Sequence, residues 1–159
     1  MYLWIVLTFL ADRITKALVI NALKPGQSIP VLPGMIHLTH VRNAGAAFGM
    51  LAGRIWILSV ATIFLVAFLL WLHHFSIYRK FILSSSLGLI IGGALGNLAD
   101  RILLGFVVDF VDLRIWPVFN VADVAIVAGA ITAAIYFWRM ADQHELDALQ
   151  GKEMAENGG

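Results

Sequence analysis

The segment from Val108 to Gly129 reads VDFVDLRIWPVFNVADVAIVAG. It holds three aspartates, Asp109, Asp112 and Asp123, and the last of them stands where an apolar helix is predicted to begin. The whole chain is 60% hydrophobic and only 13% charged, a composition typical of membrane proteins rather than soluble domains. A carboxylate at or below a membrane surface is costly and tends to be functional. The segment therefore predicts the reactive part of a membrane-embedded enzyme.

Long uncharged runs elsewhere in the 159 residues predict a membrane frame. About 20 apolar residues cross a bilayer as a helix. Runs of this length predict four transmembrane helices, at about 2–22, 55–73, 81–101 and 120–139. The expected fold class is an all-α integral membrane protein with one membrane-embedded domain, residues 1–140. In the third run Gly88, Gly92 and Gly96 recur every four residues, a stripe that favours close helix packing.

The segments between and after these helices differ in character. Residues 24–54 carry turn-forming Pro and Gly residues and an alternating stretch at 35–42, which predicts a short strand inside a lid or binding surface. Residues 102–119 are expected to form a second loop, with Asp112 as a solvated carboxylate. Residues 141–159 are polar and are expected to form a solvated, partly disordered tail.

Two groups of charges leave more than one interpretation open. Asp12 and Lys16 are four residues apart in the first helix and share a face. They form either an internal ion pair, with the lysine reaching toward the surface, or a pair that points into an active site. Asp123 is either a reactive group or simply an acid that suits the first turn of its helix.

Alternation of four spans places particular helix ends on one side of the membrane. The end of the first helix, the start of the second, the end of the third and the start of the fourth share that side. The polar groups expected there are Lys16, the loop 43–49, Asn97, Asp100, Arg101, Asp109, Asp112, Asn120 and Asp123. Because purely structural charges would scatter over both ends, this collection predicts a single site at one membrane surface.

The residue types present restrict the chemistry of that site. The chain has no cysteine, no H-E-x-x-H and no G-x-S-x-G, so thiol, zinc-peptidase and elbow-serine mechanisms lack their residues. Ser84–Ser86 belong to the face opposite Lys16. His37 and His40 have no third ligand nearby, so no metal and no cofactor are expected. What remains is a pair of aspartates that shares a proton and activates water.

Five motifs occur in order along nearly the whole chain. They are Asp12-x-x-Thr-Lys16, Asn43-Ala-Gly-Ala-Ala-Phe48, Gly92-Gly-Ala-Leu-Gly-Asn-Leu-Ala-Asp-Arg101, Val107-Val-Asp-Phe110 and Phe119-Asn-Val-Ala-Asp123. Together they resemble the motifs of bacterial lipoprotein signal peptidase, signal peptidase II. The resemblance implies a four-span aspartic endopeptidase with a small extracytoplasmic β-cradle. Such an enzyme cuts the signal peptide from a prolipoprotein just before its diacylglyceryl-modified cysteine.

The resemblance also assigns roles to single residues. Asp109 and Asp123 correspond to the catalytic pair. The substrate-binding and supporting positions correspond to Asn43, Asn97, Arg101, Asn120, Asp12, Lys16 and Asp100. The implied partners are a lipidated prolipoprotein and membrane lipids, and the chain is expected to act as a monomer. The implied location is the bacterial cytoplasmic (inner) membrane, with the active site near the extracytoplasmic face and both termini inside.

Two other classes of protein were weighed against the peptidase. A small proton-coupled membrane carrier subunit would also use intramembrane acids and bases, but would place them across the depth of the bilayer. A membrane adaptor without catalytic activity would have no need for several costly acids. The net charge of +1 leaves no basic surface for nucleic acid.

Overall fold

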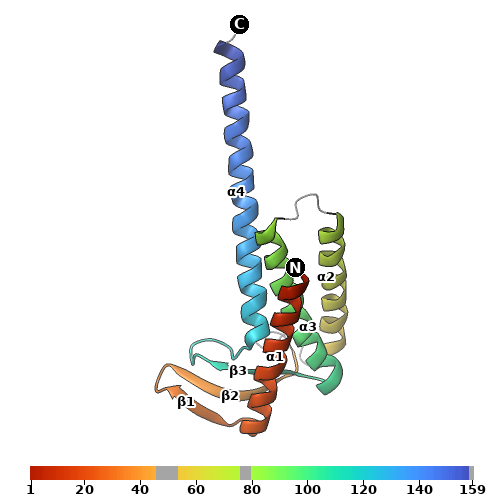
Figure 1. Ribbon diagram of the computed structural model, residues 1–159. Coiled ribbons are helices and arrows are strands. Elements are labelled where there is room, and N and C mark those ends of the chain that lie inside the picture. The colour runs from red at the N-terminus through yellow and green to blue at the C-terminus, as the bar shows by residue number, and fades with distance from the viewer. Residues whose placement is uncertain (46–53, 76–79, 158–159) are drawn as a thin grey trace.

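The computed structural model describes residues 1–45, 54–75 and 80–157. Its elements are α1 (Tyr2–Ala22), β1 (Ser28–Leu32), β2 (Ile36–Asn43), α2 (Ile55–Phe75), α3 (Phe81–Leu104), β3 (Val107–Asp112) and α4 (Val121–Asn157). Figure 1 shows a helical bundle with a small sheet at one end and a long extension of α4 at the other. Much of the predicted loop 43–49 lies outside the described residues.

Three helical segments in the described ranges are long and apolar enough to cross a membrane. They are Ile55–Phe75, Phe81–Leu104 and Val121–Gln143. The predicted helical membrane protein is therefore confirmed at this level. α1 is also 21 residues long, but Asp12, Arg13 and Lys16 interrupt its apolar sequence.

α3 lies in the middle of the bundle and packs against α1, α2 and α4. Gly92 approaches α1 so closely that an added Cβ would lie 2.7 Å from the carbonyl oxygen of Ile5, and Gly88 makes a similar contact one turn earlier. At Gly96 an added Cβ would collide with the carboxylate of Asp12. The predicted glycine stripe is thus confirmed as a packing surface. It brings the charged part of α1 directly against α3.

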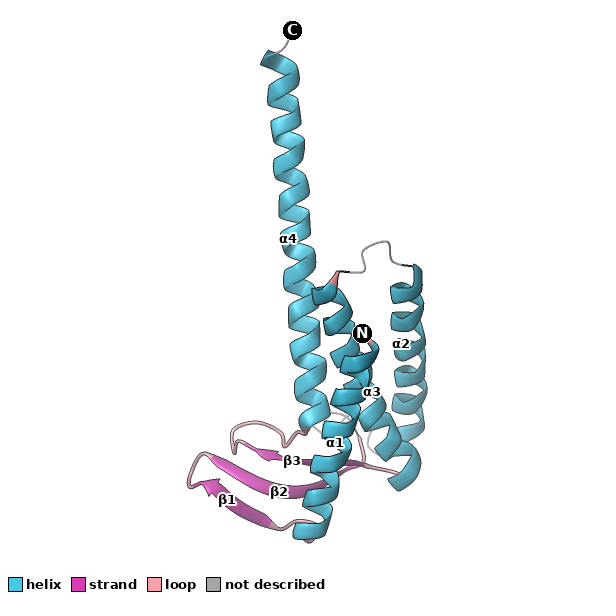
Figure 2. Cartoon of the chain, viewed as in Figure 1, coloured by secondary structure: helices cyan, strands magenta, loops and turns pink. Residues whose placement is uncertain are grey.

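A three-stranded antiparallel sheet in the order β1-β2-β3 lies at one end of the bundle (Figure 2). β2 matches the strand predicted at 35–42. The prediction of a loop throughout 102–119 is wrong at 107–112, which form β3. Five of the six β3 residues are buried. Because both faces of this strand are covered, its sequence lacks the alternation that reveals a half-exposed strand.

The turn between α3 and β3 places the strand beside the helix ends. Gly105 follows α3 with φ 77°, a left-handed conformation that glycine adopts at little cost and that commonly ends helices. The chain then enters β3 almost at once. Val108 and Phe110 pack against Val19 and Leu23 at the end of α1. This apolar contact holds β3 close to the charged parts of α1 and α3.

α4 is longer than predicted. The expectation that the helix ends near residue 139 is wrong, because α4 continues to Asn157. The segment from 140 to 157 contains no proline and is rich in Ala, Glu, Leu and Gln, which favour helix. Polarity alone does not prevent a helix from continuing.

Candidate active site

The polar residues predicted to converge do lie at the sheet end of the bundle. Asp109 is on β3, Asp123 is in the first turn of α4, and Asn43 is the last residue of β2. Asn97 and Asp100 come from the last two turns of α3. Segments that are far apart in sequence therefore contribute to one hydrogen-bonded cluster.

Asp109 is 3% exposed and accepts hydrogen bonds on both carboxylate oxygens. The Asn43 Nδ2 group donates to Asp109 Oδ2 at 2.9 Å, and the Asn120 Nδ2 group donates to Asp109 Oδ1 at 2.6 Å. Burial raises the pKa of Asp109 to about 6, and the negative charge of Asp123 adds to the rise, while the two amide hydrogen bonds oppose it. The pKa of Asp109 is therefore shifted from its ordinary value toward neutrality.

Asp123 is held by reciprocal capping at the start of α4. Its backbone N–H donates to Asn120 Oδ1 at 3.0 Å, and the backbone N–H of Asn120 donates to Asp123 Oδ2 at 3.1 Å. This is the geometry of a capping box. The second oxygen, Oδ1, accepts from Asn97 Nδ2 at 2.8 Å. Capping thus fixes the position of the Asp123 carboxyl group without excluding a chemical role for it.

Asn120 and Asn97 connect the two aspartates. Asn120 Nδ2, whose residue is fully buried, donates to Asp109 Oδ1 and lies 3.0 Å from Asn97 Oδ1. Asn97 in turn donates to Asp123. The two carboxyl groups are therefore linked by a continuous chain of side-chain amides.

A buried ionic network lies beside this chain. Lys16 is 0% exposed, and its ammonium group contacts three acceptors: Asn97 Oδ1 at 2.8 Å, Asp12 Oδ2 at 2.9 Å and Asp100 Oδ2 at 2.9 Å. The ammonium group thus donates a hydrogen bond to Asn97 and is neutralised by two buried carboxylates, which compensates for its removal from water. The ion pair of Asp12 and Lys16 is internal, but the expectation that the lysine reaches toward the surface is wrong, because Lys16 is 0% exposed. Lys16 also contacts the amide chain through Asn97.

The two acids of this network fasten neighbouring segments. Asp12 Oδ1 accepts the backbone N–H of Ala122 at 3.1 Å, so α1 satisfies one of the open N–H groups at the start of α4. Asp100 Oδ2 accepts the backbone N–H of Val108 at 3.1 Å, and its Oδ1 is paired with Arg13. The sequence analysis assigned no role to Arg13. Its position next to Asp12, in an otherwise apolar helix, indicates that it also has a buried acidic partner.

Arg101 lies at the edge of the cluster. It is half-buried, close to the charges of Asp123, Asp109 and Asp100. Its Nε–H is buried and has no hydrogen-bond partner in the part of the chain that the structure describes. A buried donor without a partner is costly. This group is therefore suited to an acceptor supplied by a ligand, such as a peptide carbonyl.

Asp112 does not belong to this cluster, and the expectation that it is a solvated loop carboxylate is wrong. It is only 7% exposed and ends β3. Thr39 Oγ1 donates to its Oδ2 at 2.7 Å, and the backbone N–H of Arg114 donates to its Oδ1 at 2.9 Å. The Thr39 hydrogen bond and the Arg114 contacts lower the pKa of Asp112. Asp112 is a structural anion of the sheet.

The two histidines of the H-x-x-H pair have different partners. His37 Nδ1 lies 2.6 Å from Arg114 Nη2, and His40 Nδ1 lies 2.9 Å from the carbonyl oxygen of Leu23. In the described ranges no three His, Asp or Glu side chains are arranged to hold a metal ion.

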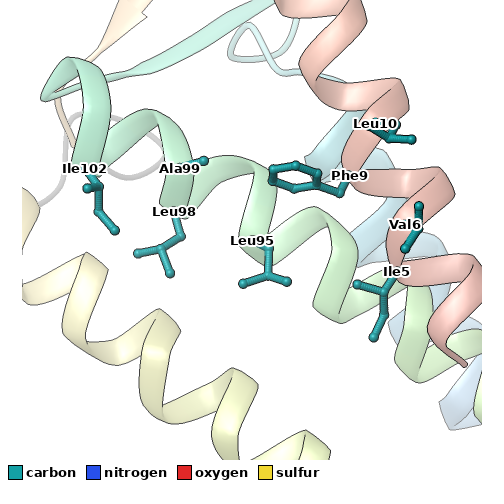
Figure 3. A pocket seen from close by; sticks show the side chains of 8 residues that line it. All are labelled: Ile5, Val6, Phe9, Leu10, Leu95, Leu98, Ala99 and Ile102. Carbon is teal, nitrogen blue, oxygen red and sulfur yellow. The ribbon is translucent and has the colours of Figure 1, made fainter.

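A separate groove lies between α1 and α3 and has a volume of about 430 Å³ (Figure 3). It is lined by Ile5, Val6, Phe9, Leu10, Leu95, Leu98, Ala99 and Ile102. None of these side chains can donate or accept a hydrogen bond. The groove therefore suits hydrocarbon and not the reaction of a peptide bond.

These features define a class: a helical membrane enzyme with a buried, amide-linked carboxyl cluster at one end of its bundle. The family described as signal peptidase (SPase) II matches residues 4–139. A lipoprotein signal peptidase of Halothermothrix orenii is 45% identical over 138 residues, covering 87% of this chain and 94% of that protein. One of Pelotomaculum thermopropionicum is 48% identical over 137 residues, covering 84% and 90%.

A solved bacterial membrane enzyme, determined in meso at 2.3 Å, superimposes with a TM-score of 0.84 at 32% identity, covering 89% of this chain and 88% of that one. A second, determined in meso at 1.9 Å, gives a TM-score of 0.78 at 33% identity. The chain belongs to the signal peptidase II family. The resemblance found in the sequence and the aspartic peptidase class that it implied are therefore confirmed.

Proposed function

We propose that this chain removes signal peptides from lipid-modified prolipoproteins, with Asp109 and Asp123 as the catalytic pair. The observation that carries the proposal is the chain of amides from Asp109 through Asn120 and Asn97 to Asp123. It holds two carboxyl groups from different elements within one buried cluster. Membership of the family supplies the substrate class.

The two carboxyl groups differ in a way that suits acid and base roles. Asp109 has a pKa raised to about 6, so it readily keeps a proton. Asp123 accepts N–H groups on both oxygens at the start of α4, so its carboxyl group is held in place facing the amide chain. The pair shares one proton. The ionised carboxylate takes a proton from water as the water oxygen attacks the scissile carbonyl carbon, and the protonated carboxyl stabilises the carbonyl oxygen. A proton then passes to the leaving nitrogen as the C–N bond breaks.

The other site residues support the substrate and the pair. Arg101 Nε–H and the Asn97 amide border the carboxyl groups, and they are proposed to hold the substrate backbone. Asn43 donates to Asp109 and lines the same site. The cut is proposed to fall just before the lipid-modified cysteine. Asp12, Lys16 and Asp100 are proposed to keep the helix ends in register.

The membrane arrangement is part of the same proposal. α1 crosses the membrane together with α2, α3 and α4, which makes four spans. Its charged residues Asp12 and Lys16 are fully buried against α3, whereas its apolar residues, such as Leu7, Ile14 and Leu18, are exposed. A helix of this kind presents hydrocarbon outward despite its charges. Both termini lie in the cytoplasm, and the sheet lies at the outer face of the cytoplasmic membrane. The protein acts as a monomer surrounded by lipid.

A proton-coupled carrier fits less well. The buried charged residues among the described positions, including Asp12, Lys16, Asp100, Asp109 and Asp112, all lie at the sheet end of the bundle. A carrier needs polar groups at the depth of the bilayer centre. The described part of the chain offers no such charged path.

The direct test is cleavage of a purified lipidated prolipoprotein by the purified protein. Loss of the signal peptide, seen as a mass shift, is expected only for the lipidated substrate. The same prolipoprotein with its cysteine left unmodified serves as the control. Equal cleavage of both would contradict the proposed substrate class, and no cleavage of either by well-folded protein would contradict the proposed activity.

A further inference from the structure

The end of the sheet farthest from α3 is called the sheet tip here and comprises residues 31–35 and 113–117. These two segments lie together because His37 pairs with Asp112 at this end of the sheet (Figure 2). The exposed apolar residues of the sheet tip are Val31, Leu32, Met35, Ile115 and Trp116. Ile115 is 92% exposed and Trp116 is 62% exposed. A cluster of large exposed apolar side chains marks a surface that binds something.

The loop that carries Ile115 and Trp116 is fastened to the sheet. Arg114 adopts φ 65°, an uncommon conformation for a residue with a side chain. Its backbone N–H donates to Asp112, and its guanidinium group contacts His37 Nδ1 at 2.6 Å and Ser28 Oγ at 3.3 Å. Strained backbone persists only where surrounding contacts hold it. The two apolar residues that follow are therefore presented outward by a fixed turn.

The exposed charges of the sheet region are of one sign. Within residues 24–45 and 105–119, Lys24, Arg42 and Arg114 are exposed, whereas the acids, Asp109 and Asp112, are buried. Arg114 lies in the sheet tip, where it also contacts Asp112 at 3.7 Å, whereas Lys24 and Arg42 lie toward the other end of the sheet. An exposed base next to apolar side chains suits a surface with negative headgroups and a hydrocarbon interior.

The apolar surface of α1 reaches the level of the sheet. Val19 packs against β3, while its neighbours Leu18 and Ile20 are 63% and 42% exposed. Lipid that covers the outer face of α1 therefore extends to the height at which the sheet projects sideways from the bundle (Figure 1). The sheet tip lies at the edge of this layer.

We propose that the sheet tip inserts into the membrane surface, with Ile115, Trp116 and Met35 in the upper acyl region and Arg114 at anionic headgroups. Trp is favoured at this depth because its ring is apolar and its N–H is polar. The contact holds the sheet, and Asp109 with it, at a fixed height above a substrate anchored in the same leaflet. It does not depend on the proposed hydrolysis, so failure of one proposal leaves the other standing.

The absence of cysteine makes a direct test simple. A spin label at Ile115→Cys is introduced into protein held in lipid discs, and its collisions with oxygen and with a water-soluble nickel chelate are compared. A label at Phe64→Cys, 71% exposed on α2, provides the reference for a lipid-facing site. The label at position 115 is expected to favour oxygen, as the reference does. Free access of the nickel chelate would overturn the proposal, and so would shielding from both reagents, which would indicate a protein partner.

A second variant tests the turn and the charge. Arg114→Gln, combined with the label at position 115, removes the guanidinium contacts and one base. The label is expected to collide more often with the nickel chelate and less often with oxygen than it does without the Arg114 substitution. This change should be larger in discs that contain phosphatidylglycerol than in discs of phosphatidylcholine alone. A label whose collisions are unchanged in both lipids would overturn the role given to Arg114. Thermal unfolding in detergent, where this exposed residue should matter little, confirms that the variant is folded.

Discussion

Asn120 and Asp123 cap one another at the start of α4, each side chain accepting the backbone N–H of the other. The same two side chains also belong to the amide chain that leads to Asp109. The local structure that begins the helix is therefore the structure that orients one half of the proposed catalytic pair. A substitution that preserves the cap can remove the chemistry without unfolding the helix.

Asp109→Asn and Asp123→Asn are each expected to lower cleavage by about 10²–10⁴-fold or more while the protein stays folded. The double variant should be scarcely worse than either single one, because the pair acts as a unit. Asn at position 123 keeps an oxygen for the cap. The measurement is the initial rate of signal-peptide release, with helicity and thermal unfolding checked in parallel.

Asp112→Asn is the matched control for these variants. It lies on the same strand as Asp109 but contacts Thr39 and Arg114 instead of the amide chain. It should retain most of the cleavage rate. Near-native turnover by Asp109→Asn or Asp123→Asn, or an Asp112→Asn variant as inactive as they are, would refute the assignment.

The raised pKa of Asp109 makes stability depend on pH. Its value rises from 3.8 to about 6 on folding, so the folded protein holds this proton more tightly than the unfolded chain. The resulting stability is fully present below about pH 3.8 and is lost as the pH rises through about 6. A shift of this size corresponds to about 3 kcal/mol at most. Asp109→Asn should flatten this part of the profile when melting temperature is measured against pH.

Asp112 should act in the opposite direction. Its pKa is lowered by Thr39 and Arg114, so its contribution is present above the ordinary aspartate pKa and is lost as the pH falls. Asp112→Asn should therefore remove stability at neutral pH and flatten the acid side of the profile. If both variants changed the profile in the same direction, the pKa assignments would be wrong.

Asp12→Asn is expected to lower the free energy of unfolding by about 3 kcal/mol, because it removes one of the two buried carboxylates that contact the Lys16 ammonium group. The asparagine oxygen can still accept the Ala122 N–H, so cleavage per folded molecule should fall only in part. Arg13→Gln provides the comparison, since the Arg13 side chain is 28% exposed and its loss should cost less. Complete loss of cleavage by folded Asp12→Asn would move Asp12 into the reacting set.

Gly92→Ala should separate α1 from α3. The new methyl group would meet the Ile5 carbonyl oxygen at 2.7 Å and the Thr8 Cβ at 2.8 Å, and neither backbone nor Cβ can move alone. Overpacking of this kind costs roughly 1–3 kcal/mol. Ser85→Ala, at an exposed position on the same helix, is the control and should change the melting temperature little. Equal melting temperatures for the two variants would show that the helices are not tightly packed at Gly92.

The proposed topology is tested with single cysteines in this cysteine-free chain. A membrane-impermeant thiol reagent added outside spheroplasts should modify Gln27→Cys, on the exposed turn before β1, and should leave Ser76→Cys unmodified until the cells are opened. Labelling of each variant is detected as an increase in the mass of the protein. The reverse pattern would overturn the placement of the sheet outside the cell.

The sequence predicted the frame and the site better than the sheet. Long apolar runs predicted the helix ends to within a few residues, apart from the C-terminal end of α4, because hydrophobic length is a strong signal. Convergence at one end followed from the alternation of helix ends. β3 was missed because burial on both faces removes alternation. Missing β3 also led to the wrong prediction that Asp112 is solvated, since acids in loops usually are. Its partner Thr39 lies 73 residues away in the sequence, so no local pattern indicated the contact.

Contacts between distant residues were also beyond sequence reasoning. The pairing of Arg13 with Asp100 and the acceptance of the Ala122 N–H by Asp12 join segments 87 and 110 residues apart. No local pattern specifies such partners, since they depend on how the glycine stripe seats α1 on α3. The motif order indicated that these residues matter together without indicating which atoms meet.

The length of α4 has a practical consequence. Its 37 residues extend for about 55 Å, whereas the apolar part, Val121–Gln143, accounts for about 35 Å. The remaining turns form a stiff stalk that carries the C-terminus away from the bundle, on the side opposite the sheet (Figure 1). An affinity tag or fluorescent reporter fused after residue 159 would stand clear of the bilayer. The protein can thus be captured on a surface by this handle while the sheet end of the bundle, with its carboxyl cluster, stays accessible.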